Sequence, residues 1–325
     1  MFLTPLVARL PLPSRTVQKA VGIAAIVAQA GIGVTGSVVR VTGSGLGCRT
    51  WPQCQPGSMF PVEHAEYAGI HQWIEFSNRL LTGLVVVVAV IAVITAWRVK
   101  IDQPHRRRLV ALAWTMPGGV VLQAVVGGMT VLAKLEWWTV AIHFLASTLL
   151  IWLAVLLLHA FGEGDERPRW VVPPLARRLL PVLVVAMWAI LVAGTTVTGA
   201  GPHGGDPDTH RLDAPIQTLA QIHGGLLVVY LLVLVTFGLA LLRGGVPKRV
   251  WRRYAAVWVI ALAQGALGSV QYALGVPEAL VSLHVLGSAL VIVATGALWC
   301  ASRDRGVLPA REVSPREAEE LTATG

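Results

Sequence analysis

Long apolar stretches without charged residues alternate with short polar segments along most of the chain. A membrane-spanning helix needs about 20 apolar residues, and eight stretches come close to that length. They cover residues 20–39, 80–97, 109–133, 137–162, 179–197, 214–242, 254–277 and 279–301. Strands of a membrane barrel have only about ten residues of alternating polarity. The pattern therefore predicts eight transmembrane helices.

Two helix starts need further argument. The second helix is expected to begin near Ile70, because residues 71–79 read as a continuous helix with polar side chains. The first apolar run follows Arg9 and Arg15, as it would in a secretory signal peptide. It has full spanning length and lacks a clear small-residue cleavage site, so we interpret it as the first transmembrane helix.

Composition supports a membrane protein. Of 325 residues, 55% are hydrophobic and 13% are charged, whereas about a quarter of a soluble domain is charged. These values exclude a disordered chain, a disulfide-rich mini-protein and an ordinary soluble enzyme. The predicted fold class is an all-α integral membrane protein. The net charge is +9. Basic loops that face the anionic lipid of the bilayer explain this charge more simply than binding to nucleic acid does.

The basic residues are concentrated in the loops after the second, fourth and sixth helices. Those loops carry Arg98, Lys100, Arg106, Arg107, Arg108, Arg167, Arg169, Arg177, Arg178, Arg243, Lys248, Arg249, Arg252 and Arg253. Basic loops stay on the cytoplasmic side. We therefore expect a multi-pass protein of the cell (plasma) membrane with both termini in the cytoplasm and the 1–2 and 5–6 loops outside.

The two halves of the chain repeat each other. Gln123 precedes His143 by the same interval that separates Gln264 from His284, and QAVVGGMTV matches QGALGSVQY. VTGSG at 41–45 likewise matches VTGAG at 197–201. Four helices in each half predict parallel repeats folded as two pseudo-symmetric four-helix bundles. The expected parts are an N-terminal bundle (1–162), a cytoplasmic linker (163–178), a C-terminal bundle (179–302) and a flexible cytoplasmic tail (303–325).

Three histidines lie at similar depth below the outer face, roughly 9–14 Å inside helices four, six and eight. They are His143, His223 and His284. Intramembrane imidazoles are usually functional, although a single one is often a packing residue or a proton relay. Two at equal depth on repeat-related helices favour axial ligation of one haem iron by His223 and His284. A non-haem metal is less natural, because no carboxylate or thiolate cluster joins them.

The first bundle differs at the matching position. Asn78 stands where the repeat places His223, and His71 and Glu75 lie one or two turns before it on a similar face. Glu75 has Arg79 at i+4, so it is either half of a helix-surface salt bridge or an acid/base or orienting group. This asymmetry suggests that one site holds a fixed cofactor and the other a substrate that enters and leaves.

The 1–2 loop contains Cys48 and Cys54. Because this loop is expected to face an oxidising compartment, a disulfide between them is plausible. It would be either a structural staple or a redox-active pair. Zinc is improbable, since two thiols without further ligands do not make a site.

The string VTGSGLGCRTWPQC is followed in order by IEFSNR, HF, TGAGPHGGD, QIH and SLH, over all eight spans. In these motifs the chain resembles the heme A synthase family, in an actinobacterial-like variant. The resemblance implies a membrane oxidoreductase of cytochrome oxidase assembly, which oxidises a methyl group of heme O to the formyl group of heme A by successive hydroxylation. It further implies heme b as cofactor on His223 and His284, heme O near His143, a catalytic Glu75 and a Cys48–Cys54 disulfide.

One position departs from the family, in which many members have His where this chain has Asn78. His71 could replace that ligand, or the substrate iron could be five-coordinate. Arg40 and Arg79 are candidates for binding the haem propionates, and Arg211 is a weaker one, because arginine pairs well with carboxylates. A heme O synthase is the expected supplier of substrate, and the sequence does not identify the electron donor or acceptor. The alternatives are a bis-histidine cytochrome b for electron transfer, a haem transporter and a structural assembly factor.

Overall fold

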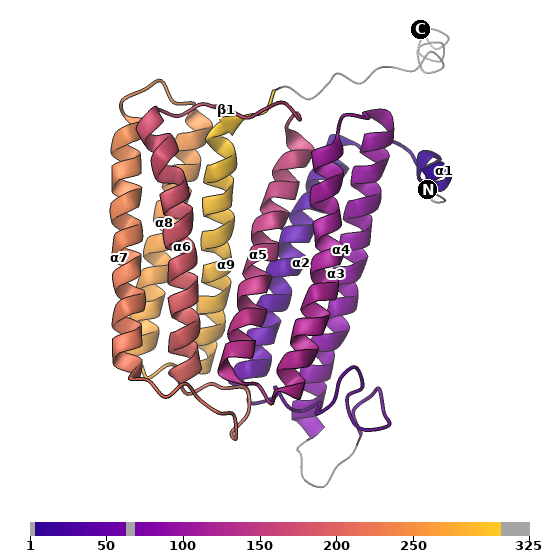
Figure 1. Ribbon diagram of the computed structural model, residues 1–325, viewed down its shortest axis with the longest axis vertical. Coiled ribbons are helices and arrows are strands. Elements are labelled where there is room, and N and C mark those ends of the chain that lie inside the picture. The colour runs from indigo at the N-terminus through magenta and orange to yellow at the C-terminus, as the bar shows by residue number, and fades with distance from the viewer. Residues whose placement is uncertain (1–3, 63–68, 307–325) are drawn as a thin grey trace.

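The computed structural model describes residues 4–62 and 69–306. Within them, eight long helices stand side by side (Figure 1). They are α2 (Arg15–Val41), α3 (Gly69–Asp102), α4 (Arg107–Leu132), α5 (Trp137–Gly162), α6 (Pro174–Ala200), α7 (Ile216–Leu241), α8 (Lys248–Ala273) and α9 (Glu278–Ala301). Each is long and apolar enough to cross a bilayer. The predicted all-α integral membrane fold with eight spanning helices is confirmed, and α3 starts beside Ile70 as expected.

Three helices begin five or six residues earlier than the charge-free stretches indicated, and the first of them is α2, which begins at Arg15 rather than at 20. α6 begins at Pro174 rather than at 179, since proline is favoured in the first turn of a helix. α8 begins at Lys248 rather than at 254 and carries its basic residues in its first two turns. Charged residues at a membrane boundary can continue a helix. An apolar run therefore marks the part of a helix that lies in the hydrocarbon core of the bilayer, and not the residues at which the helix begins and ends.

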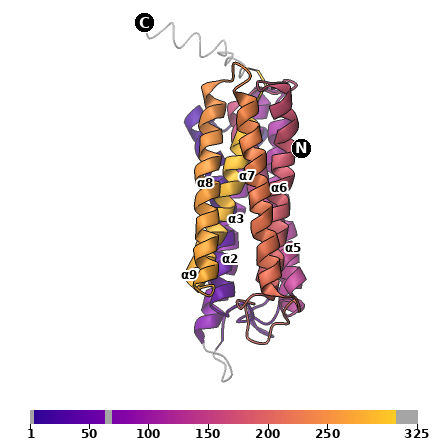
Figure 2. The same ribbon diagram turned by 90° about the vertical axis from the view of Figure 1, so that its left-hand side faces the viewer.

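Helices α2–α5 pack on one another as one group and α6–α9 as a second (Figure 1). The two groups meet where α2 and α5 contact α9, and where α5 contacts α6. Figure 2 shows the second group standing in front of the first with nearly parallel axes. The seam between the bundles therefore runs the full height of the protein.

The bundles are packed differently. The first has a core rich in alanine, including Ala89, Ala92, Ala96 and Ala113, and such small residues let membrane helices approach closely. The second has a core of larger side chains, in which the buried Tyr230 hydroxyl lies 2.9 Å from Thr295 Oγ1. The first bundle is thus held by close helix contact and the second by interlocking side chains.

The short elements lie at one end of the bundles. α1 (Thr4–Ala8), which the sequence did not predict, precedes Leu10, whose carbonyl accepts a hydrogen bond of 2.7 Å from Arg98 Nε. β1 (Arg169–Trp170) pairs antiparallel with β2 (Arg303–Asp304), so the linker holds the first residues of the predicted tail. The rest of that tail, from 307, lies outside the described residues.

The opposite end is formed by residues 42–62, 133–136, 201–215 and 274–277, and is called the distal end below. At the end that carries α1 and β2, Arg106 is completely buried. It pairs with Asp165 at 3.2 Å and donates to the carbonyls of Ala160 and Glu163. This guanidinium fastens the start of α4 to the end of α5.

Replacing Arg106 by alanine should destabilise the fold by about 3 kcal/mol, because it leaves a buried carboxylate and two carbonyls without their donor. The matched control is Arg169→Ala, which removes an exposed ion pair with Glu166 and should cost less than about 1 kcal/mol. Thermal unfolding of both variants in detergent measures the difference. Equal unfolding midpoints would contradict the role given to Arg106.

Candidate functional site

Two cavities lie toward the distal end. The first, of about 290 Å³, lies at the seam between the bundles, and the second, of about 460 Å³, lies among α6–α9. They share a wall, because Arg40, Gly194, His203, His223 and His284 line both. The site is therefore one region with two compartments.

His223 of α7 and His284 of α9 face each other in this wall. Their ring centroids are 6.3 Å apart and their planes are tilted by 58°. A metal ion bonded to an imidazole nitrogen on each side at about 2 Å leaves the ring centroids roughly 6 Å apart. The spacing of the pair thus fits axial ligation of one haem iron.

A second contact orients His223. Its Nδ1 lies 3.0 Å from the Ile190 carbonyl of α6. A carbonyl can only accept, so Nδ1 carries the proton and Nε2 is left as the lone-pair donor. Histidine ligands of metals are held in this way by a hydrogen bond through the other ring nitrogen.

Each ring of the pair packs against a glycine. A Cβ atom at Gly194 would lie 3.1 Å from His223 Cε1, and one at Gly268 would lie 2.9 Å from His284 Cε1. Both distances are tighter than ordinary van der Waals contact. The absence of a side chain at Gly194 and Gly268 therefore leaves room for the two imidazole rings.

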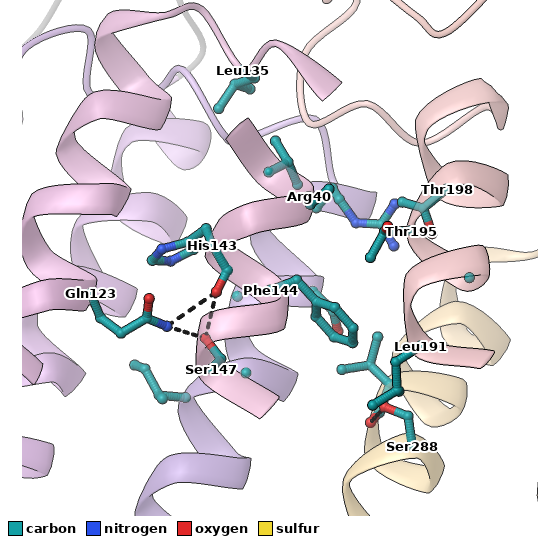
Figure 3. A pocket seen from close by; sticks show the side chains of 18 of the residues that line it. Arg40, Gln123, Leu135, His143, Phe144, Ser147, Leu191, Thr195, Thr198 and Ser288 are labelled. Atoms are coloured by element: carbon teal, nitrogen blue, oxygen red, sulfur yellow. Dashed lines mark hydrogen bonds between the residues drawn. The ribbon is translucent and has the colours of Figure 1, made fainter. Parts of the chain in front are cut away.

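The first bundle repeats this arrangement around His143. A Cβ atom at Gly127 would lie 3.1 Å from His143 Cε1. Gln123 Nε2 donates to the His143 carbonyl at 3.2 Å and also to Ser147 (Figure 3), just as Gln264 Nε2 donates to the His284 carbonyl at 2.9 Å. The internal repeat seen in the sequence thus corresponds to the same hydrogen bond and the same ring contact in both halves.

Asn78 also lines the first cavity, together with His143. Its Oδ1 accepts a hydrogen bond of 2.7 Å from Thr35, and its Nδ2 would lie 3.9 Å from a Cβ atom at Gly36. Asn78 thus has a glycine behind it, as His223 does. The side chain faces the cavity with an amide in place of an imidazole.

His71 lies elsewhere. Its Nδ1 is 2.8 Å from the Ser44 hydroxyl, at the junction of α3 with the distal loop. It is not among the residues that line either cavity. The structure therefore does not bring His71 together with His143.

Glu75 is buried, with both carboxylate oxygens engaged. Oε2 accepts the backbone N–H of Cys48 at 2.7 Å, and Oε1 accepts Arg79 Nη2 at 2.6 Å. Arg79 also donates to the carbonyls of Cys48, Thr50 and Gln53. The i,i+4 ion pair is thus present, and together the two side chains clamp the loop of residues 48–54 rather than lining a cavity.

The predicted disulfide between Cys48 and Cys54 is confirmed, and both cysteines are buried. Trp51, at the tip of this loop, packs against α4, since a Cβ atom at Gly128 would lie within 3 Å of its indole ring. Gly128 follows the glycine that supports His143. The loop therefore covers the distal end of α4 beside the first cavity.

Sequence reasoning did not single out His203, which comes from the distal loop between α6 and α7. Its Nε2 lies 2.8 Å from the Val276 carbonyl, and its own carbonyl accepts Arg40 Nη1 at 2.8 Å. The available clue was its place in TGAGPHGGD, directly after the repeated VTGAG. Of the three arginines proposed for propionates, Arg40 lines both cavities, Arg211 lines the first, and Arg79 lines neither.

Glu75→Ala should make the Cys48–Cys54 disulfide roughly tenfold more reactive toward a mild reductant, because hydrogen bonds to a charged group contribute about 1.5–3 kcal/mol each. The rate of thiol alkylation after reduction in membrane vesicles measures this. Glu136→Ala is the control, since the Glu136 contact with His210 is a single ion pair of 3.5 Å near the surface. A rate equal to that of the unmodified chain would contradict the clamp.

Residues 19–202, more than half of the chain, match the profile of the family described as cytochrome oxidase assembly protein (COX15-CtaA). A heme A synthase of Alkalihalophilus pseudofirmus is 34% identical over 133 residues, which are 40% of this chain and 42% of the relative. A heme A synthase of Staphylococcus aureus (strain JH9) is 23% identical over 281 residues, covering 82% of this chain and 89% of the relative. The chain belongs to the cytochrome oxidase assembly protein family.

Proposed function

We propose that this protein is a heme A synthase, a membrane oxidoreductase that oxidises a methyl group of heme O to the formyl group of heme A by successive hydroxylation. The carrying observation is the asymmetry between the halves. A histidine pair at 6.3 Å lies in the C-terminal bundle, whereas His143 is the one histidine of α2–α5 that lines the first cavity. Relatives named heme A synthase support the same assignment.

The resident cofactor is heme b, held by His223 and His284. The ring spacing, the protonated Nδ1 of His223 and the glycines behind both rings support this fit. The buried Nδ1 of His284 has no hydrogen-bond partner among the described residues. A haem bound here supplies one-electron transfer, while the protein supplies its position and surroundings.

Heme O as substrate occupies the first cavity, beside His143. Apolar side chains such as Val85, Val120 and Phe144 line it and exclude water from the reacting carbon. His143 would hold the iron, and Asn78, whose amide oxygen accepts a hydrogen bond from Thr35, would offer its NH2 group as a donor to the bound molecule. One histidine ligand holds a haem less tightly than two do. Weaker binding suits a substrate that must leave the site as product.

Glu75 is required for the reaction as a positioning residue. Its two oxygens bond Cys48 and Arg79, so it acts by keeping the 48–54 loop and Trp51 packed on α4 beside the first cavity. Arg40 binds propionates at the cavity wall. Arg79 is occupied by Glu75 and by the loop carbonyls, so its contribution is to the loop.

The protein resides in the cell membrane with both termini cytoplasmic. This orientation is supported by the basic residues of the α3–α4, α5–α6 and α7–α8 connections, which lie at the end that carries α1 and β2 (Figure 1). The distal loops and their disulfide then face the oxidising side. A heme O synthase in the same membrane supplies the substrate.

The conversion itself is the test. Expressed in a bacterial membrane that contains heme O but no heme A, the protein should yield heme A or its hydroxymethyl precursor, detected by chromatography with mass detection. His143→Ala should abolish the product because it removes the ligand of the substrate. If haem-loaded, folded protein supplied with an electron partner returned only unchanged heme O, a cytochrome b or a transporter would be the better reading.

The same assay decides the role of His71. We expect His71→Ala to keep most of the product, because the side chain bonds Ser44 and lies outside the cavity lining. Loss of product equal to that of His143→Ala, with the disulfide loop intact, would instead support His71 as the second ligand.

Gly268→Ala should lower occupancy of the bis-histidine haem severalfold, because the added methyl group would displace the ring of His284. Gly118→Ala is the matched control, since nothing lies within 4 Å of a Cβ atom there. The absorption of haem bound to each purified protein measures occupancy. Equal occupancy in the two variants would exclude the proposed dependence on ring position.

A further inference from the structure

Two arginines that line the first cavity at its distal end have no acidic partner among the described residues. Arg40 Nη1 donates to the His203 carbonyl, and Arg211 Nη2 donates to the carbonyls of Thr198 and Gly201. Neither forms an ion pair with a carboxylate in the part of the chain that the structure describes. They lie beside the same loop segment, because Arg40 bonds the His203 carbonyl and a Cβ atom at the next residue, Gly204, would lie 3.2 Å from Arg211 Cζ. Two partly buried cations without counter-charge favour an anion between or beside them.

No carboxylate in or beside the described distal loops, Asp208, Asp213 and Glu278 included, forms an ion pair with either arginine. Glu75 binds Arg79, Glu136 faces His210 at 3.5 Å, and an Asp206 carboxylate oxygen accepts the backbone N–H of Asp208. The C-terminal end of α2, where Arg40 lies, offers only the partial negative charge of its last carbonyls. An anionic group of a bound molecule would complete this cluster.

Arg40 has a special place because it lines both cavities, while Arg211 lines only the first. Figure 3 shows its guanidinium extending from α2 toward Thr195 and Thr198 of α6. In the repeat, VTGSG at 41–45 matches VTGAG at 197–201, so Arg40 corresponds to Thr196. At this position the second bundle has no arginine of its own, and the first bundle provides one.

We propose that Arg40 is a single anion anchor shared by the two cavities, binding a carboxylate of the molecule in each, with Arg211 assisting in the first cavity alone. The inference rests on the proposed function, which makes these carboxylates haem propionates. A guanidinium has five N–H donors, and only one hydrogen bond of Arg40, to His203, is made within the described chain. The remaining donors can serve one carboxylate on each side.

This arrangement solves an electrostatic problem. Two haems in adjoining cavities would bring propionates toward a common wall, where like charges repel strongly in a medium of low dielectric constant. A cation between them offsets this repulsion. Arg40 thus allows both cavities to be filled at once.

The test is the rate at which purified haem-loaded protein releases heme b from His223 and His284 to an excess of a haem-scavenging protein. Arg40→Gln should release it roughly tenfold faster, because a charge-assisted hydrogen bond contributes about 1.5–3 kcal/mol. Arg211→Gln should not change this rate. Arg98→Gln is the matched control at the end of the protein opposite the distal loops, where Arg98 Nε donates to the Leu10 carbonyl.

The first cavity is tested in the His223→Ala background with haem bound at His143. There, both Arg40→Gln and Arg211→Gln should speed release. If only Arg211→Gln did so, Arg40 would serve the second cavity alone and the shared anchor would be wrong.

Haem with both propionates esterified separates charge recognition from folding. The unmodified chain should release the ester as fast as Arg40→Gln releases heme b, and Arg40→Gln should add no further penalty. A penalty that persisted with the ester would make Arg40 a structural residue and overturn the inference. Failure of the unmodified chain to take up haem with a bis-histidine spectrum would instead defeat the proposed function itself.

Discussion

The packing of a histidine ring against a glycine of the neighbouring helix is the contact on which the rest of the site depends. It occurs three times, in the pairs Gly127–His143, Gly194–His223 and Gly268–His284. A Cβ atom at any of these glycines would come within 3.1 Å of the ring. Because protein interiors are close-packed, this contact fixes both the distance between the helices and the direction in which each imidazole points. The two cavities are the space that remains in front of the rings.

The fold could be predicted from the sequence almost entirely, because the bilayer imposes a length and a polarity on every spanning helix. What could not be predicted is where helices end. Lys248 and its neighbours begin α8 although they are charged, since backbone hydrogen bonding continues past the apolar core. The short pairing of β1 with β2 was likewise invisible, because it joins residues more than 130 positions apart.

The site was predictable where local spacing carries the information. The equal Gln-to-His intervals identified His143 and His284, and the structure has the same side-chain hydrogen bond in both places. The separate roles of Arg40 and Arg79 were not predictable. Arg79 is enclosed by the carbonyls of a loop some 25 to 30 residues earlier in the chain, and the path of that loop is not a local property. The same holds for Glu75, whose second oxygen meets the backbone of Cys48.

Duplication of one scaffold explains how two different sites arise from nearly the same helices. Both halves keep the glycine contacts and the glutamine hydrogen bonds, so the frame is constant. The differences are confined to single positions, with Asn78 opposite His223 in the repeat and Arg40 opposite Thr196. In the proposed function, the amide of Asn78 leaves the first cavity with one histidine ligand, where the second has two. Arg40, which only the first half supplies, then places one positive charge in the wall that both cavities share.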